Sequence, residues 1–162
     1  MRFFSSEGTN DKFELLDLRD VIAESLNFCA EKLKINRVNL QTEIPDLPAF
    51  SNCQKVQIIQ VLFNLLNNAF DACHKLPNPE IKIELVFEPD FARIQISDNG
   101  TGVSQAIEAK IMQPFFTTKP VGSGSGLGLS VALGIAHAHH GTIFLDRKIS
   151  SSCFVLKLPL AK

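Results

Sequence analysis

Several polar residues interrupt an otherwise apolar segment, QVLFNLLNNAFDA, and two of its asparagines and its aspartate have the spacing of one helix face. Asn64 and Asn68 are four residues apart, and Asp71 follows three residues later, so a helix would place all three on one face. Carboxamide and carboxylate oxygens at this spacing can complete the shell of a magnesium ion that is otherwise held by substrate phosphates and water. The alternative is that these side chains are solvated or cap backbone groups, and this segment alone does not decide between the two.

A second group of interest is SDNGTGV, which follows a β-rich run. Asp98 stands at the end of the expected strand, where its carboxylate can accept a hydrogen bond from an exocyclic amine. Gly100 and Gly102 would let the backbone pass close to a flat ligand. Asp-Asn-Gly is also an ordinary turn sequence, so a plain β-turn is an equal alternative.

A glycine-rich stretch, VGSGSGLGLSVALGIA, leads directly into an apolar helical pattern. Free backbone N–H groups and the positive end of a helix dipole suit a phosphate. The string lacks the GxxxxGK[ST] pattern of P-loop enzymes and does not follow a strand as a dinucleotide fingerprint does, which argues against both. A flexible loop without a ligand is the alternative. The four glycines of this stretch are Gly122, Gly124, Gly126 and Gly128.

The segment MQPFFTTKP lies between the last two groups and carries two adjacent aromatic residues. Phe115 and Phe116 can anchor a lid over a bound ligand, and Lys119, after Thr117 and Thr118, offers a point charge to a terminal phosphate. The alternative is a hydrophobic latch with a solvated lysine.

The periodicity of the chain predicts the elements that must position these groups. Residues 1–12 have no periodicity and read as a tail or linker, so we expect one domain over residues 13–162. Asp17 is a suitable cap for the first helix, and the long helix carries the apolar stripe Val56, Ile59, Phe63, Leu66 and Phe70. We expect helices over about 17–34, 52–75 and 126–140, and strands over 38–42, 81–88, 91–97, 141–147 and 153–159.

These elements predict an α/β fold of two layers. Because the strands arrive in pairs, we expect a mixed, mostly antiparallel sheet of about five strands with three main helices packed on one face. A chain of 162 residues with 45% hydrophobic residues is enough for one core. The ligand would lie between the helix layer and the lid.

Composition narrows the partners and the setting. A formal net charge of -1 does not indicate a nucleic-acid or membrane surface, and no apolar run approaches the ~20 residues of a membrane span. The four cysteines are far apart in sequence, which argues against a disulfide framework or zinc site and favours a cytoplasmic setting. His137, His139 and His140 fit the end of a helix better than a metal cluster.

The order of the four groups resembles the catalytic, ATP-binding domain of sensor histidine kinases, in the superfamily shared with gyrase, the heat-shock-90 chaperones and MutL. NLLNNAFDA resembles the N box of that family, SDNGTGV its first glycine box, PFFTTK its F box and GSGSGLGLS its second glycine box. FFTTKP together with NAFDA is most similar to the nitrogen-regulation subclass. This Bergerat-type resemblance covers nearly the whole chain from Phe13 to Pro159.

The resemblance implies that ATP and Mg²⁺ are the cofactors. Asn68 would bind the metal, Asn64 and Asp71 would lie near the phosphates, and Asp98 would bind the adenine amino group. Lys119 and Asn64 would act in catalysis. The remaining implied nucleotide-binding residues are Gly100, Gly102, Phe115, Phe116, Thr118, Gly124, Gly126, Leu127, Gly128, Leu129 and Cys153.

Two differences from the family pattern shape the expected activity. ATP-hydrolysing relatives carry a glutamate base at the place of Asn64, and an amide cannot take a proton from water, which favours transfer over hydrolysis. Cys153 stands where the family has a threonine that helps to hold adenine.

The resemblance also implies the partners. Because the chain has no H box, the phosphoacceptor histidine is expected in a separate dimerisation segment of the same kinase, with a response regulator receiver domain downstream and a monomeric fragment here. A non-catalytic nucleotide-binding module is the second hypothesis, and an ATPase of the gyrase or chaperone kind is the third.

Overall fold

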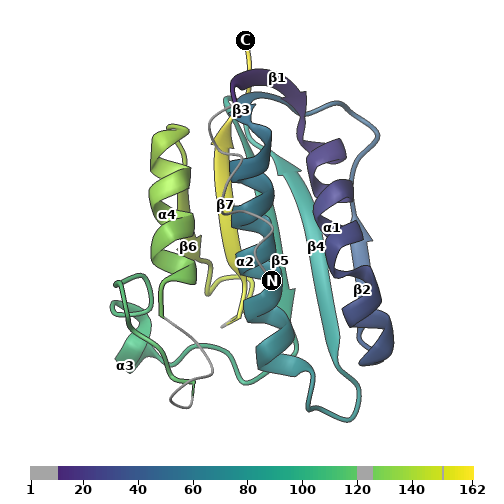
Figure 1. Cartoon of the computed structure of the whole chain (residues 1–162), viewed down its shortest axis with the longest axis vertical. Helices are drawn as coiled ribbons and strands as arrows, with labels where there is room; N and C mark the ends of the chain where they lie inside the picture. The colour runs from purple at the N-terminus through teal and green to yellow at the C-terminus, as the bar shows by residue number, and fades with distance from the viewer. Residues whose placement is uncertain (1–10, 120–125, 151) are drawn as a thin grey trace.

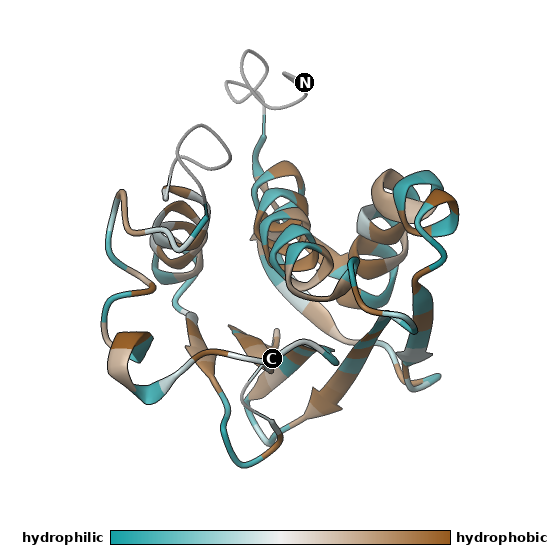
Figure 2. Ribbon diagram, turned by 90° about the horizontal axis from the view of Figure 1, so that it is seen from below, coloured by the Kyte–Doolittle hydropathy of each residue, from teal (hydrophilic) through white to brown (hydrophobic). Residues whose placement is uncertain are grey.

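The computed structural model describes residues 11–119, 126–150 and 152–162. Three helices lie side by side over one face of a sheet, as Figures 1 and 2 show. The predicted two-layer α/β fold, with a mostly antiparallel sheet and helices on one face, is confirmed. The elements are β1 (Phe13–Asp17), α1 (Leu18–Ile35), β2 (Asn39–Glu43), β3 (Phe50–Gln54), α2 (Lys55–Cys73), β4 (Glu80–Phe87), β5 (Phe91–Asp98), α3 (Gln105–Glu108), α4 (Gly128–Ala138), β6 (Thr142–Leu145) and β7 (Phe154–Pro159).

The main sheet has five strands in the order β2-β4-β5-β7-β6. Only β2 runs parallel to its neighbour, β4, and the other pairs are antiparallel. Alternate residues of the central strands point at the helices, so that Ile83, Ile96 and Phe154 lie in register across three strands. Strand β5 lies at the centre of this sheet, and Asp98 at its end is paired with Ile81 of β4, while the pairing with β7 ends two residues earlier, at Ile96.

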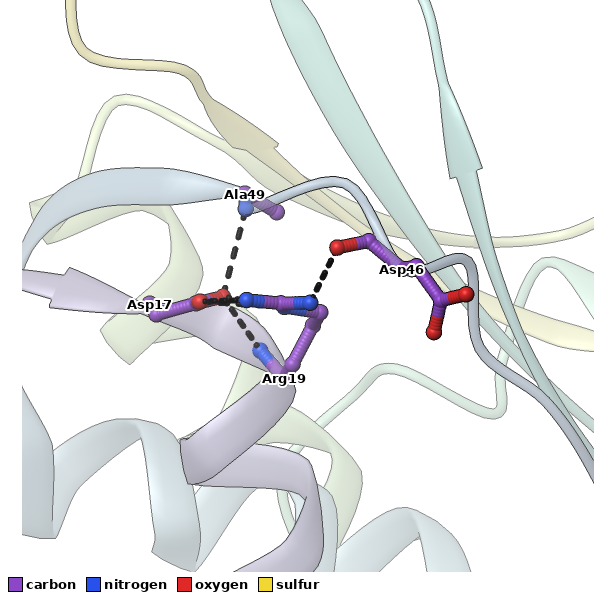
Figure 3. A network of polar contacts seen from close by, with 4 residues as sticks. All are labelled: Asp17, Arg19, Asp46 and Ala49. Atoms are coloured by element: carbon purple, nitrogen blue, oxygen red, sulfur yellow. Dashed lines mark hydrogen bonds and ion pairs between the residues drawn. The ribbon is translucent and has the colours of Figure 1, made fainter.

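The start of α1 is fixed by a polar network around Asp17, which confirms the predicted cap (Figure 3). Its Oδ1 accepts hydrogen bonds from the backbone N–H groups of Arg19 (3.0 Å) and Ala49 (3.2 Å). The Arg19 side chain binds the same carboxylate at 2.7 Å and donates to the carbonyl oxygen of Asp46. The hydrogen bond from Arg19 is the main cause that holds the pKa of Asp17 below its usual value. This network ties the loop after β2 to the first turn of α1.

The long helix α2 begins later than predicted and buries three of the five residues of the predicted stripe, Ile59, Leu66 and Phe70. Residues Phe50–Gln54, where the helix was expected to start, form strand β3, with Ser51 and Cys53 facing inward. Val56 is 41% exposed and Phe63 is half-buried, so the predicted stripe is wrong at these two positions. The apolar residues of α2 cover more than one face, and packing against both α1 and α4 selects the buried ones. These are Ile58, Ile59, Val61, Leu62, Leu65, Leu66, Ala69, Phe70 and Cys73.

A short antiparallel ribbon of β1 and β3 was not predicted from the sequence. It pairs Phe13 with Gln54 and Asp17 with Phe50, and forms a sheet separate from the five-stranded one. Phe13, Leu15 and Phe50 are exposed on it by 46% to 60%. The large apolar residues of this ribbon are therefore exposed instead of alternating between a buried and an exposed face. For this reason the hydrophobic periodicity did not indicate the two strands.

The N-terminus of α2 is capped by residues from two distant parts of the chain. Its own N-cap residue, Gln54, makes no side-chain cap. Instead, the Asp11 carboxylate accepts hydrogen bonds from the backbone N–H groups of Val56 (3.3 Å) and Gln57 (3.1 Å). The ring of His139, which is 2% exposed, accepts from the N–H of Gln54 (3.1 Å) through Nε2. These bonds satisfy amide groups that a helix start leaves unpaired.

The last predicted elements are shifted by one to two residues. Helix α4 covers Gly128–Ala138 rather than 126–140, and β7 begins at Phe154 rather than Cys153. No helix in the described ranges is both long and apolar enough to cross a membrane. All four cysteines are buried with free thiols.

Candidate functional site

One cavity lies where the C-terminal end of α2, the N-terminal end of α4 and α3 come together, at the lower end of the molecule in Figure 1. It measures about 310 Å³, which is at the lower end of the range for small-molecule sites. The lining residues are Asn68, Asp71, Ala72, Asp98, Thr101, Gly102, Val103, Ile107, Ile111, Phe116, Thr117, Thr118, Lys119, Leu129, Ser152 and Phe154.

Asp98 is a half-buried carboxylate in the lining of this cavity. Burial raises the pKa of this carboxyl to about 6, and the hydrogen bond from the Gly100 N–H to Oδ1 (2.7 Å) opposes that rise. Among the described residues, we find no second donor to the carboxylate. A half-buried acceptor with one partner is suited to a ligand that donates a hydrogen bond, such as an exocyclic amine.

The glycines beside Asp98 leave no room for larger residues. A Cβ on Gly100 would lie 2.5 Å from the Ala72 carbonyl oxygen of α2 and 2.8 Å from Asp98 Oδ1. Gly102 has a φ of 78°, in the left-handed region that favours glycine. The chain therefore passes directly against α2 here and leaves the space in front of Asp98 open.

The face of α2 that carries the asparagines points toward the cavity and the start of α4. Asn68 and Asp71 line the cavity. Asn64, one turn earlier, donates from Nδ2 to the carbonyl oxygen of Gly128 at 3.1 Å. Asn64 thus connects the asparagine helix to the first residue of α4 rather than lining the cavity.

Lys119 closes one side of the cavity by pairing with Asp71. The Lys119 Nζ forms an ion pair with Asp71 Oδ2, and the Lys119 N–H donates to Thr117 Oγ1 at 3.0 Å. Phe116 is half-buried and packs against the core, whereas Phe115 is 75% exposed. One of the two adjacent phenylalanines anchors this segment, and the other lies outside the cavity.

The glycine-rich stretch meets the phenylalanine segment at Gly126. Gly126 has a φ of 71°, and a Cβ there would lie 2.3 Å from the carbonyl carbon of Phe115. The backbones of these two segments are therefore in direct contact beside the cavity. Gly122 and Gly124 lie outside the described residues.

Ser152 is a lining residue that the sequence did not indicate. Its hydroxyl donates to the carbonyl oxygen of Asp98 at 2.7 Å, so it fixes the backbone that carries the half-buried carboxylate. Cys153, the predicted adenine-side residue, is fully buried, and burial raises the pKa of its thiol to about 11. Within the described part of the chain, Cys153 is not in the cavity lining.

Arg147 holds the cavity wall formed by the segment after β5. It donates from Nε to Glu108 Oε2 and from Nη2 to the carbonyl oxygen of Val103, both at 2.6 Å. Arg147 lies in the β6–β7 connection, 39 residues from Glu108. No local pattern could have revealed it, because only the fold brings these segments together.

The predicted site residues therefore differ in where they lie relative to the cavity. Eight of them line the cavity: Asn68, Asp71, Asp98, Gly102, Phe116, Thr118, Lys119 and Leu129. Asn64, Gly100, Gly126 and Gly128 lie behind the lining and hold its backbones, as described above. Phe115 and Leu127 are not among the lining residues that the structure describes. Their individual roles stay predictions.

Comparison with known families agrees with this arrangement. Residues 53–162 match the family described as histidine kinase-, DNA gyrase B-, and HSP90-like ATPase. The chain belongs to this family. The matched part includes the asparagine helix, Asp98 and both glycine boxes of this ATPase-family domain.

The sequence relatives are sensor proteins and kinases, among them a two-component sensor. PprA of Pseudomonas aeruginosa is 33% identical over 144 residues, which make up 85% of this chain and 15% of that protein. The C4-dicarboxylate transport sensor protein DctS of Rhodobacter capsulatus is 32% identical over 148 residues, or 90% of this chain and 22% of that protein. The ATPase-family domain thus spans about a fifth or less of these relatives.

The structural neighbours are histidine kinase catalytic domains. The nucleotide-free catalytic domain of histidine kinase ThkA superposes with a TM-score of 0.82 at 27% identity, covering 93% of this chain and 99% of that one. The resemblance to sensor histidine kinases is confirmed. The nitrogen-regulation subclass stays a prediction.

Proposed function

We propose that this chain is the ATP-binding catalytic domain of a sensor histidine kinase and transfers the γ-phosphoryl group of ATP to a histidine in a separate phosphoacceptor segment. The observation that carries the proposal is that Asp98, Asn68 and Lys119, from three separate motifs, line one cavity in a domain of this family. A magnesium nucleotide needs a hydrogen-bond acceptor for its amine, an amide that binds the metal and a cation for its phosphates. Asp98, Asn68 and Lys119 supply these groups in that order.

The residues present fit a purine at the Asp98 end. The carboxylate accepts a hydrogen bond from the exocyclic amine, while the close approach of Gly100 to α2 leaves a flat space beside it. Ile107, Ile111 and Phe154 give this part of the lining an apolar surface for the ring.

The residues at the other end fit a magnesium-bound triphosphate. Asn68 and Asp71 offer the hard oxygen atoms that Mg²⁺ prefers. When bound, the metal neutralises charge on the phosphate oxygens. Lys119 binds a phosphate oxygen, and Phe116 anchors the segment that places it there.

Asn64 favours phosphoryl transfer over ATP hydrolysis. Its amide is not a base, and its Nδ2 donates a hydrogen bond to the Gly128 carbonyl oxygen rather than lining the cavity. The domain accordingly preserves ATP for a histidine nucleophile by omitting the group that would activate water.

The proposed partners lie outside this domain. We place the phosphoacceptor histidine in a dimerisation segment of the same kinase and a response regulator receiver domain downstream of it. The structure of ThkA in complex with the response regulator protein TrrA supports this order, with 26% identity and a TM-score of 0.78 over 92% of this chain and 42% of that one. Phosphorelay signalling in the cytoplasm is the corresponding setting.

Calorimetric titration tests the nucleotide site. We expect the chain to bind a non-hydrolysable ATP analogue with Mg²⁺, Asp98→Ala to abolish binding, and Asn68→Ala to remove mainly the dependence on Mg²⁺. A folded chain that binds no nucleotide would overturn the proposal.

Transfer of label from ATP tests the kinase activity. The chain is mixed with labelled ATP and the purified phosphoacceptor segment of the full-length kinase that carries this domain. Acid-labile label on that segment supports the kinase. Nucleotide binding without transfer, by contrast, identifies a non-catalytic regulatory module, and rapid release of free phosphate identifies an ATPase of the gyrase or chaperone kind.

A further inference from the structure

The ion pair between Lys119 and Asp71 stands where the phosphates of a nucleotide would bind. We propose that this pair competes with the phosphates: Lys119 has to leave Asp71 before it can bind a phosphate oxygen, and Asp71 thereby makes nucleotide binding depend on an accompanying cation. The inference rests on the proposed function, because it concerns the same cavity.

The geometry places both partners at the rim of the cavity. Asp71 lies on α2, one turn beyond Asn68, and Lys119 approaches it from the segment that follows Phe116. Their side chains are 37% and 36% exposed, so water reaches the pair and it can exchange partners. The bond from the Lys119 N–H to Thr117 holds the lysine backbone beside the opening.

The charge balance of the lining explains why the pair matters. Among the described lining residues, Lys119 is the single cation, against the two carboxylates of Asp71 and Asp98. The neighbouring residues 120–125 contain no charged side chain. While Lys119 is paired with Asp71, the described lining therefore offers no uncompensated positive charge to a phosphate.

Breaking the pair has a second consequence. Once Lys119 turns to a phosphate, Asp71 is left as an unpaired carboxylate on the helix face that also carries Asn68, and it repels the phosphates. A divalent cation bound with the nucleotide removes that repulsion. Asp71 is thus a specificity-determining residue that discriminates a metal-bound nucleotide from a metal-free one.

The experiment measures affinity for a non-hydrolysable ATP analogue by calorimetry, in Mg²⁺ and in a chelator. We expect Asp71→Asn to tighten binding in the chelator by about two- to fivefold, the range of one exposed ion pair. The ratio of the dissociation constants in chelator and in Mg²⁺ should fall by at least that factor. Lys119→Met should weaken binding in both conditions.

The double variant separates competition from repulsion. In the Lys119→Met background, Asp71→Asn should tighten chelator binding by less, because no lysine remains to be released. An equal gain in both backgrounds would show that Asp71 acts by repulsion alone and would overturn the competition. Glu31 is an exposed carboxylate on α1, so Glu31→Gln is the matched control for the change of net charge. It should leave the dissociation constants in chelator and in Mg²⁺ unchanged.

The remaining outcomes separate this inference from the proposed function. If the chain binds nucleotide and requires Asp98, but Asp71→Asn behaves like Glu31→Gln, then this inference alone is wrong. If the chain binds no nucleotide in either condition, the proposed function fails, and the inference fails with it. Thermal melts of each variant verify that the compared chains are folded.

Discussion

The two ends of the cavity are built in different ways. At the Asp98 end, the central strand of the sheet, the Ser152 hydroxyl and a glycine in contact with α2 hold one half-buried carboxylate. At the Lys119 end, single polar contacts join segments that are half-exposed, such as the pair with Asp71 and the bond from Asn64 to Gly128. The first end is fixed by backbone and burial, and the second by exchangeable side-chain contacts.

This difference indicates that the Asp98 end discriminates between ligands, whereas the contacts at the Lys119 end change when a ligand binds. An acceptor fixed by a sheet discriminates between ligands at small cost, because little has to be ordered on binding. At the Lys119 end, the polar groups already bond to each other before binding. A ligand has to replace these bonds with its own, so the contacts there depend on the ligand. Substitutions at the Asp98 end should therefore cost more than comparable ones at the Lys119 end.

The largest expected effect is that of Gly100→Ala. The added Cβ would meet the Ala72 carbonyl oxygen at 2.5 Å, a backbone atom of α2 that cannot rotate away, and Asp98 Oδ1 at 2.8 Å. We expect the free energy of unfolding to fall by about 1–3 kcal/mol and nucleotide binding to be lost, as measured by denaturant titration and calorimetry. Gly134→Ala, on α4 with nothing within 4 Å of the added Cβ, is the matched control and should stabilise the domain by up to about 1 kcal/mol. Equal effects of the two substitutions would contradict the close packing at Gly100.

The second prediction concerns pH and the Asp98 end. Because the pKa of Asp98 is raised to about 6, its carboxylate gains a proton as the pH falls through that value. One of its two oxygens then carries an O–H group and is a donor instead of an acceptor. Affinity for the ATP analogue should fall by about tenfold between pH 7 and pH 5, since one pH unit below its pKa about a tenth of an acid is ionised. Titration of the Lys119→Met variant gives the comparison, because its affinity should fall with the same midpoint. A flat profile in the wild-type chain would show that Asp98 does not titrate in this range.

The third prediction is a gain of stability at the cost of binding. The folded pKa of Asp98 lies above its ordinary value of 3.8, so the folded state binds more protons between the two values and loses stability as the pH rises through this window. Asp98→Asn removes that charge and can keep the bond from the Gly100 N–H. Near neutral pH the variant should be more stable by about 1 kcal/mol or less, a value reduced because the carboxyl is not fully buried. Melting temperatures at pH 4 and pH 8 check the sign, since the gain should be present at pH 8 and nearly absent at pH 4.

The smallest expected effect is that of Asn64→Ala. It removes one half-exposed hydrogen bond to the Gly128 carbonyl oxygen, which should cost about 0.5–1 kcal/mol of unfolding free energy. Nucleotide affinity should fall by no more than a few-fold, because Asn64 supports α4 from behind the cavity. A loss as large as that of Gly100→Ala would show that the Lys119 end is as rigid as the Asp98 end.

The sequence predicted the fold class and the motif residues because both depend on local patterns. Strand alternation in β4 and β5 and the apolar content of α2 could be read directly, and so could Asp98 at the end of a strand. The ribbon of β1 and β3 was not predicted because its large apolar residues are exposed. In α2, Val56 was misassigned because apolar residues occur around most of the helix, so only the neighbouring helices define the buried side.

The missed site residues share a different cause. Ser152 and Arg147 act through carbonyl oxygens that lie 54 and 44 residues away in the chain, at Asp98 and Val103. A serine or arginine in a loop carries no sign of such a partner. Their roles follow from the order of strands in the sheet, which places the β6–β7 connection beside the end of β5.

The distant capping of α2 bears on how this domain can be trimmed. A protein cut to the family match at residue 53 would lack α1, β1 and β2, and one cut at residue 13 would keep every helix and strand but lose Asp11. In both cases, the amide groups of Val56 and Gln57 would lose their partner. A protein that keeps this cap therefore has to begin before the first strand, at a residue with no recognisable motif, and shortened versions that start later should fray at the N-terminal end of the asparagine helix.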